Sequence, residues 1–183
     1  FVAMAKAKPG TLSDGTTGIG STGHLFRERL KAIGGIDLLH VPYKSQVDVH
    51  NDMLAGRIDF SLPSMSGTMP LVRSGKLRAL AVTAAQRWPA AAEVPTVGEA
   101  GLPGFEQTNW YGVAAPAALP QALLQRINGD MVRMGQTAEY RERIGEFGVA
   151  PVSMNTAQFL AFVKSEIEYW GQLVKLSGAK PVD

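Results

Sequence analysis

Short apolar runs alternate with helical patterns along the first half of the chain, and a glycine or a proline follows most of them. Apolar runs typical of buried strands occupy residues 36–41, 58–62 and 77–83, and residues 12–16 form a further, brief predicted strand. Helical patterns lie between these runs. This alternation of strand and helix predicts an α/β fold in which helices flank a small parallel or mixed sheet.

The helical segments are marked by their apolar spacing and by their ends. Phe26, Leu30 and Ile33 recur at i, i+4 and i+7 directly after a glycine-rich stretch, and Gly34 ends that pattern. The other helical segments predicted in this half are residues 1–8 and 48–55 and a short turn at 70–74.

The second half of the chain has a different pattern. Residues 87–104 are rich in proline, alanine and glycine and are typical of a connector, and 110–114 form one more predicted strand. After this strand we predict only helices, the last of them beginning at Asn155 or Thr156 and ending at Gly178. Two apolar stripes mark these helices: Leu123, Leu124, Ile127 and Met131, and then Phe159, Val163, Ile167, Trp170 and Val174.

Composition narrows the class of protein. With 183 residues, 45% of them hydrophobic and 19% charged, the chain resembles an ordinary globular protein. The net charge of +2 comes from scattered basic residues, which argues against a nucleic-acid partner. The absence of cysteine excludes disulfides and thiolate chemistry, and no apolar run in the sequence is long enough to span a bilayer.

The glycine-rich stretch GTTGIGSTG contains a formal G-x-G-x-x-G at Gly18, Gly20 and Gly23. A dinucleotide site of this kind also needs a clear strand before the glycines and an acidic residue at the end of the following strand. The following strand instead ends in His40, and we do not predict a nucleotide cofactor or any other.

The same stretch suits a less specific anion. A helix that starts near Ser21 or Thr22 leaves free backbone N–H groups at its first turn, and its dipole favours a carboxylate there. Thr16 and Thr17 add hydroxyl donors, as do Ser21 and Thr22 themselves. Composition alone supports equally well a tight strand-to-helix turn that binds nothing.

Polar side chains also follow the next two predicted strands. Tyr43 and Lys44 lie just past one strand end, where they could wall a cleft and pair with an anion, or simply be a packed tyrosine and a solvated lysine. Ser61 and Ser64 lie near the end of the next strand, which is where ligands of open α/β sheets bind, although serines are also ordinary loop residues.

Signals for catalysis are weak. His24, His40 and His50 do not have metal-ligand spacing, so we expect no metal site. The sequence contains no G-x-S-x-G motif, and spacing nominates no Ser/His/acid set. We therefore predict no catalytic residues and a binding protein rather than an enzyme.

Several motifs in order resemble one family, the Bug-type extracytoplasmic solute-binding receptors of tripartite tricarboxylate transporters. The similarity extends over essentially the whole chain and closes with the helix that carries Glu166 and Trp170. The preceding motifs are AKAKPG, GTTGIGSTGHL, HVPYKS, LAGRIDFSL, SGKLRALAVT, EVPTVGEAGLPGF and WYGVAAPAALP.

This resemblance implies a two-lobed, type II periplasmic-binding-protein fold and a periplasmic receptor. Such a receptor captures a small carboxylate solute and delivers it to membrane transporter subunits. By position, the anion-binding loop would be residues 16–22, with Tyr43 and Lys44 on the neighbouring loop. Where the family usually has glycine this chain has Ser45, which restricts or reshapes the turn after Lys44.

The resemblance also implies a division of the chain. Residues 1–106 would be the ligand-binding second lobe, and 107–183 a crossover strand and helical segment that returns towards a first lobe of about 100 residues or more. We expect the chain to be a fragment of such a receptor and to bind its solute weakly. Exposed apolar faces would favour a homodimer or a swapped assembly.

Two competing functions remain open at this point. Effector-sensing domains of regulators use similar two-lobed folds, but no DNA-binding helix-turn-helix is visible in the sequence. An enzyme acting on a carboxylate would need a catalytic side chain, and spacing offers no candidate.

Overall fold

The computed structural model describes residues 1–179. The chain forms two compact units. The first comprises Phe1–Thr108 together with the chain from Gly171 onward, and the second comprises Asn109–Trp170.

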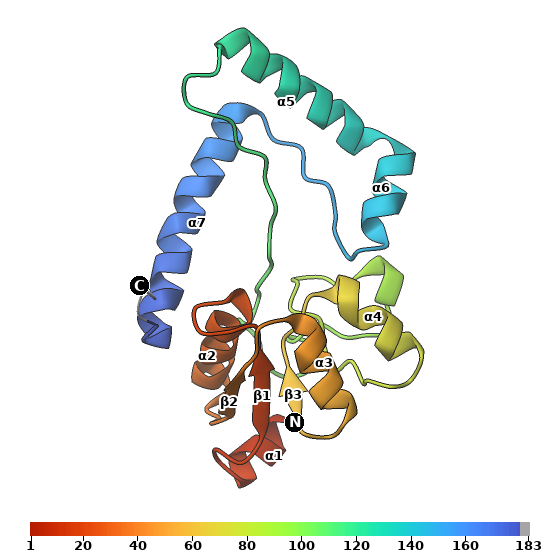
Figure 1. Cartoon of the computed structure of the whole chain (residues 1–183), viewed down its shortest axis with the longest axis vertical. Coiled ribbons are helices and arrows are strands. Elements are labelled where there is room, and N and C mark those ends of the chain that lie inside the picture. The colour runs from red at the N-terminus through yellow and green to blue at the C-terminus, as the bar shows by residue number, and fades with distance from the viewer. Residues whose placement is uncertain (180–183) are drawn as a thin grey trace. The chain divides into compact units, whose positions relative to one another are not determined.

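The first unit is built on a three-stranded sheet (Figure 1). Its strands are β1 (Ser13–Thr16), β2 (Leu39–Pro42) and β3 (Phe60–Ser61), in the order β2-β1-β3. Both pairings are parallel, so the sheet is parallel rather than mixed. The carboxyl ends of all three strands therefore lie at one edge of the sheet.

Helices join these strands, as the alternating pattern predicts. They are α1 (Val2–Ala7), α2 (Thr22–Gly34), α3 (Gln46–Leu54), α4 (Met65–Arg73) and the short 3-10 helix η1 (Pro89–Ala91). Serines cap two of the connections, because Ser21 Oγ accepts from the His24 amide and Ser45 Oγ accepts from the Asp48 amide. Gly35 ends α2 in the left-handed conformation that glycine adopts without strain.

The core of the first unit lies between the sheet and these helices. Its apolar side chains that are at most 7% exposed come from α1, α2, α3, the strand ends, the connector and the end of the chain from Gly171 onward. They are Ala5, Leu25, Phe26, Leu30, Ile36, Leu38, Val49, Ile58, Ala91, Val94, Phe105 and Leu173. The expected connector over 87–104 thus supplies core residues although it contains only η1.

Two predicted strands are not formed. In the 77–83 segment only Val82 makes a β-type contact, a single parallel bridge to Thr96 of the connector. Residues 110–114 are extended without a ladder partner among residues 1–179. An apolar run becomes a strand only when another strand offers its edge, and no strand of the described chain does so for either segment.

Helix α4 is longer than the predicted turn and begins at Met65. Ser64 precedes it in an extended conformation, and Pro70 lies within it. The turn predicted at 70–74 therefore begins too late, and the structure accommodates Pro70 within a short helix.

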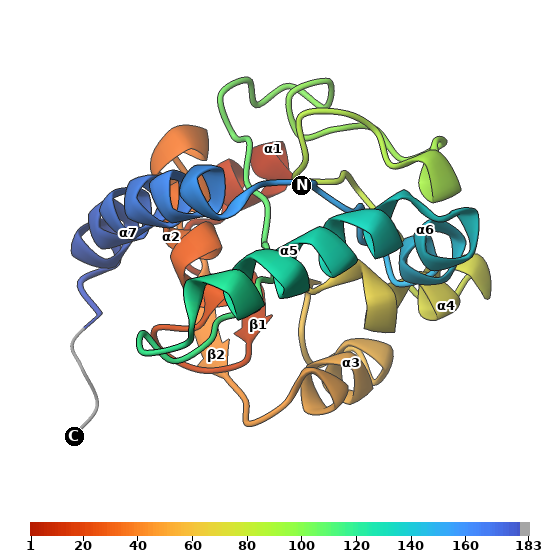
Figure 2. The same ribbon diagram turned by 90° about the horizontal axis from the view of Figure 1, so that it is seen from above.

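The second unit contains α5 (Gln121–Gln136), α6 (Ala138–Gly145) and most of α7 (Thr156–Ser177). Thr137 ends α5 in an extended conformation and caps α6, so one helix follows directly on the other (Figure 2). Trp110 packs edge-on against Phe159 and Phe162, and its indole N–H donates to Glu166 Oε2 at 2.7 Å. Within residues 1–179 no helix has the length and apolar character that crossing a membrane requires.

Candidate functional site

The loops that follow the three strands meet at the carboxyl edge of the sheet. A methyl group added at Gly23, in the first turn of α2, would lie 3.7 Å from both Leu62 O, after β3, and Thr16 Cβ. One added at Gly18 would lie 3.8 Å from Tyr43 O, after β2. Because β1 is central and its neighbours lie on either side of it, this edge is a topological switch point, the usual ligand position in open parallel sheets.

The loop between β1 and α2 is held by its own hydrogen bonds. Ser21 Oγ donates to Gly18 O at 2.7 Å, and the Gly18 amide donates to Thr16 Oγ1 at 3.3 Å. Gly18 and Gly20 have φ of 113° and 78°, a region that side-chain-bearing residues rarely adopt. The hydroxyls of Thr16 and Ser21 thus shape the loop, while Thr17 is exposed.

The first turn of α2 presents backbone donors beside this loop. The amides of Thr22 and Gly23 have no hydrogen-bond partner within residues 1–179, as expected for the first two positions of a helix. With Ser21 capping the His24 amide, the helix N-terminus remains open to an acceptor at these two N–H groups. Such an end attracts an anion through both the donors and the helix dipole.

Tyr43 is anchored away from the loop by its ring hydroxyl. Its Oη donates to Asp52 Oδ2 of α3 at 2.7 Å, while its backbone amide donates to Thr16 O at 2.8 Å. Burial, and then the bond to Asp52, raise the pKa of Tyr43. Tyr43 therefore positions the loop after β2, and its hydroxyl already has a partner within the protein. The neighbouring Lys44 is exposed.

The serines after β3 have different surroundings. Ser61 Oγ donates to Gly15 O of β1 at 2.7 Å, so its hydroxyl ties the two strands together. Ser64 is exposed, its Oγ lies 3.5 Å from Ser66 Oγ, and its amide lies 3.5 Å from Gln46 Oε1. Of the two, Ser64 has the more available hydroxyl.

Sequence reasoning missed a polar cluster directly beneath the loop. His24 of α2 stacks on His40 of β2, with ring centroids 4.7 Å apart and an interplanar angle of 15°. His40 Nε2 lies 2.7 Å from Thr16 Oγ1, and the Gly20 amide donates to His24 Nδ1 at 3.2 Å. The histidines had been considered only as metal ligands, and no group of residues in the described chain could hold a metal ion.

A buried ion pair lies next to this cluster. Asp14 of β1 is 0% exposed and its Oδ2 lies 3.1 Å from Arg27 Nε, while the Arg27 guanidinium also contacts Glu28 and Leu38 O. Burial raises the pKa of Asp14 to about 7, and the attraction of Arg27 and then Lys31 does not offset it. The only indication of this pair in the sequence was Asp14 itself, a charged residue in the middle of the strand predicted over 12–16.

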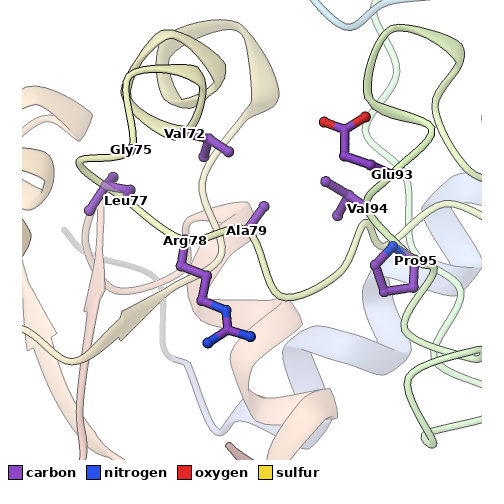
Figure 3. Close-up of a pocket in the computed structure, with 8 residues that line it drawn as sticks. All are labelled: Val72, Gly75, Leu77, Arg78, Ala79, Glu93, Val94 and Pro95. Carbon is purple, nitrogen blue, oxygen red and sulfur yellow. The ribbon is translucent and has the colours of Figure 1, made fainter.

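A separate open pocket of about 400 Å³ lies near α4. Figure 3 shows Val72, Leu77 and Arg78 on one side of it and Glu93, Val94 and Pro95 on the other. None of the residues predicted to bind a ligand lines it. The candidate site is therefore the carboxyl edge of the sheet.

Several curated proteins are similar to this chain in sequence. A curated relative from Pseudomonas sp. strain P51, the UPF0065 protein in the tcbD-tcbE intergenic region, is 34% identical over 93% of this chain. Protein BugT of Bordetella pertussis is 30% identical over 98% of it. The chain spans about half the length of these two relatives, 51% and 55%.

Solved structures agree with the fold. The R. palustris protein Rpa4515, solved with adipate, superposes with a TM-score of 0.88 at 31% identity. MatC of Rhodopseudomonas palustris, solved with bound malate, superposes with a TM-score of 0.80 at 25% identity. The matches cover 99% and 95% of this chain and 60% of each of the other chains.

The fold that superposes on these structures is also that of the periplasmic binding protein BugD, which superposes with a TM-score of 0.82 at 28% identity, so it defines one part of a solute-binding protein. The model of the tripartite tricarboxylate transporter family receptor, TctC, matches residues 1–179, and the chain belongs to this family. The resemblance to Bug-type receptors is thereby confirmed. The family consists of periplasmic receptors rather than enzymes.

Proposed function

We propose that this chain is the ligand-binding lobe of a receptor that captures a small carboxylate and delivers it to the membrane subunits of a tripartite transporter. The observation that carries the proposal is the pair of open amides, Thr22 and Gly23, at the start of α2 beside the loops of all three strands. The adipate and malate in the structures of Rpa4515 and MatC support a carboxylate of this size.

In this proposal the carboxylate accepts hydrogen bonds from the Thr22 and Gly23 amides. Gly18 and Gly20 let it approach the backbone closely, because neither carries a side chain. Thr17 and Lys44 are exposed and supply a hydroxyl and a positive charge, and Ser64 supplies a further hydroxyl from the loop after β3.

The remaining predicted ligand-binding residues, Thr16, Ser21, Tyr43 and Ser61, make contacts within the protein. Their proposed role is to hold the three loops together at the edge of the sheet. The ring of Tyr43 also forms part of the wall.

The chain corresponds in this proposal to one lobe and supplies about half of the ligand contacts. An intact receptor that binds at about 1 μM has about −8 kcal/mol of binding free energy, so a single wall leaves a dissociation constant near 1 mM. Such affinities are measurable by NMR titration.

The sharpest test removes one backbone donor without disturbing the helix. Thr22 is the first residue of α2, a position where proline is tolerated because the N–H has no helical partner. Ser21 has φ −66° and ψ 159°, the extended conformation that a following proline prefers. Thr22→Pro therefore deletes an amide N–H, and Thr22→Ala is its matched control, since it removes the hydroxyl and methyl groups of the side chain but keeps the amide.

We expect adipate or malate to shift the amide signals of Thr22 and Gly23 in the unaltered chain. Thr22→Ala should bind within about twofold, whereas Thr22→Pro should lose about ten- to a hundredfold in affinity, the usual loss for a hydrogen bond to a charged group. Dimethyl adipate, which lacks the charges, should give no response. Equal affinities for the two variants, or shifts confined to other residues, would exclude this site.

An exposed apolar stripe on α5 supports the further proposal that the chain associates with itself. Leu123, Ile127, Met131 and Met134 are between 36% and 44% exposed. A stripe of this kind favours a dimer or a swapped assembly. Light scattering across a concentration series tests this proposal, and a monomer at every concentration would exclude it.

A further inference from the structure

The stacked histidines lie directly under the proposed carboxylate site. His24 comes from the first turn of α2 and His40 from β2, and the parallel register pairs His40 with Asp14 of β1. His24 is 6% exposed, and its ring lies against that of His40 over a centroid distance of 4.7 Å. Neither ring belongs to the set of groups proposed to contact the ligand.

Each ring holds a different point of the loop between β1 and α2. His24 Nδ1 accepts a hydrogen bond from the Gly20 amide at 3.2 Å. His40 Nε2 lies 2.7 Å from Thr16 Oγ1, which in turn accepts from the Gly18 amide. The two histidines therefore reach both glycines whose positive φ gives the loop its shape.

We infer that His24 and His40 are positioning residues: acting as a stacked pair, they hold the 16–21 loop in the conformation that leaves the Thr22 and Gly23 amides open to a carboxylate. This inference rests on the proposed function. Its physical basis is preorganisation, since a loop already fixed in the binding conformation loses less entropy when the ligand arrives.

The neutral form of His24 is the one that the geometry requires. A ring nitrogen that accepts from the Gly20 amide carries no proton, so the proton of the neutral ring is on Nε2, which lies 3.9 Å from Glu28 Oε1. Burial and then the charges of Arg27 and Lys31 lower the pKa of His24, in keeping with this form.

The experiment separates the effect of side-chain volume from that of hydrogen bonding by making two substitutions at each histidine. His24→Asn keeps an acceptor near the position of Nδ1, whereas His24→Leu keeps bulk but offers no acceptor. His40→Gln keeps a polar atom near the position of Nε2, whereas His40→Leu does not. Leu30→Ala is the stability control, because Leu30 is a core residue of the same helix, 4% exposed, without a polar contact to the loop.

Three quantities are measured for every variant: the melting temperature, the Gly20 amide shift in the free protein, and the affinity for adipate by NMR titration. We expect both leucine variants to move the Gly20 signal and to lose about five- to tenfold in affinity. The asparagine and glutamine variants should recover most of that loss. Leu30→Ala should melt at a lower temperature and bind adipate as the unaltered chain does.

The outcomes separate the inference from the proposal on which it rests. If the unaltered chain binds adipate at Thr22 and Gly23 and the leucine variants bind equally well, the inference is overturned and the proposed function stands. If affinity follows melting temperature in all variants, including Leu30→Ala, the histidines have only a structural role and the inference is again overturned. No response of Thr22 and Gly23 in the unaltered chain overturns the proposed function, and the positioning role with it.

Discussion

Gly15 lies in β1 between strands β2 and β3, one residue before the loop of the candidate site. It pairs with Val41 on one side and with Ser61 on the other. A methyl group added at Gly15 would lie 2.8 Å from Val49 Cγ1 and 3.3 Å from Ile58 Cγ2. Val49 is 1% exposed and Ile58 is 5% exposed, so both are enclosed by the core and cannot move into solvent.

Gly15→Ala should therefore destabilise the first unit by overpacking. The backbone at Gly15 does not have a positive φ, so the effect comes from lack of space rather than from backbone strain. One methyl group forced into a packed core costs about 1–3 kcal/mol. At about 2–4 °C for each kcal/mol in a chain of this size, the melting temperature should fall by about 2–12 °C.

The assay is thermal unfolding followed by circular dichroism, with two comparison variants. Gly171→Ala adds the same methyl group to the interior of α7, where it would meet nothing within 4 Å, and alanine should raise helix stability by about 0.5–1 kcal/mol. Val49→Ala removes the side chain that the new methyl group meets. The double variant Gly15→Ala/Val49→Ala should therefore be more stable than the sum of the two single changes predicts.

Either of two results would refute this reasoning. A Gly15→Ala chain that melts at or above the temperature of the unaltered chain would mean that the space exists. Strict additivity in the double variant would mean that Val49 is not the side chain in the way.

The other two predictions concern charge and a helix start. Burial raises the pKa of Asp14 to about 7 and lowers that of His40 to about 4. Asp14 therefore contributes stability that is lost as pH rises from about 4 through 7, and His40 contributes stability that is lost as pH falls from about 6.5 through 4. In urea titrations between pH 7 and 5, His40→Gln should become more stable on acidification and Asp14→Asn less stable; equal slopes would contradict this. At α7, Asn155 Oδ1 accepts from the Gln158 amide at 2.9 Å and Gln158 Oε1 accepts from the Asn155 amide at 2.9 Å. Asn155→Ala should lower the free energy of unfolding by about 1 kcal/mol and Asn155→Ser should restore most of it, whereas equal losses would show that the cap is not responsible.

Local signals located most of the helices. The glycine-rich stretch, the Ser21 cap and Gly35 mark both ends of α2, and the structure places that helix at Thr22–Gly34. Helix α6 was not predicted, because Ala138–Gly145 is rich in charged residues and has no clear apolar stripe. The predicted strands over 77–83 and 110–114 were wrong because a strand requires a partner edge, and an apolar run carries no information about that edge.

Local signals also predicted part of the candidate site. A glycine-rich stretch followed by a helix start predicts a backbone anion site, and the open amides of Thr22 and Gly23 lie at that helix start. The stacking of His24 on His40 could not be seen, because the parallel register of β1 and β2 brings them together from separate elements.

Chain chemistry alone was sufficient for the α/β class, the glycine-rich turn and the family, because each depends on residue types within short windows that keep their order along the chain. Tertiary structure alone decided which hydroxyls are available. The sequence offers Tyr43 and Ser61 as donors to a ligand, yet in the structure their hydroxyls donate to Asp52 Oδ2 and Gly15 O. A donor's partner depends on which distant segment packs against it, and that is a property of the folded chain.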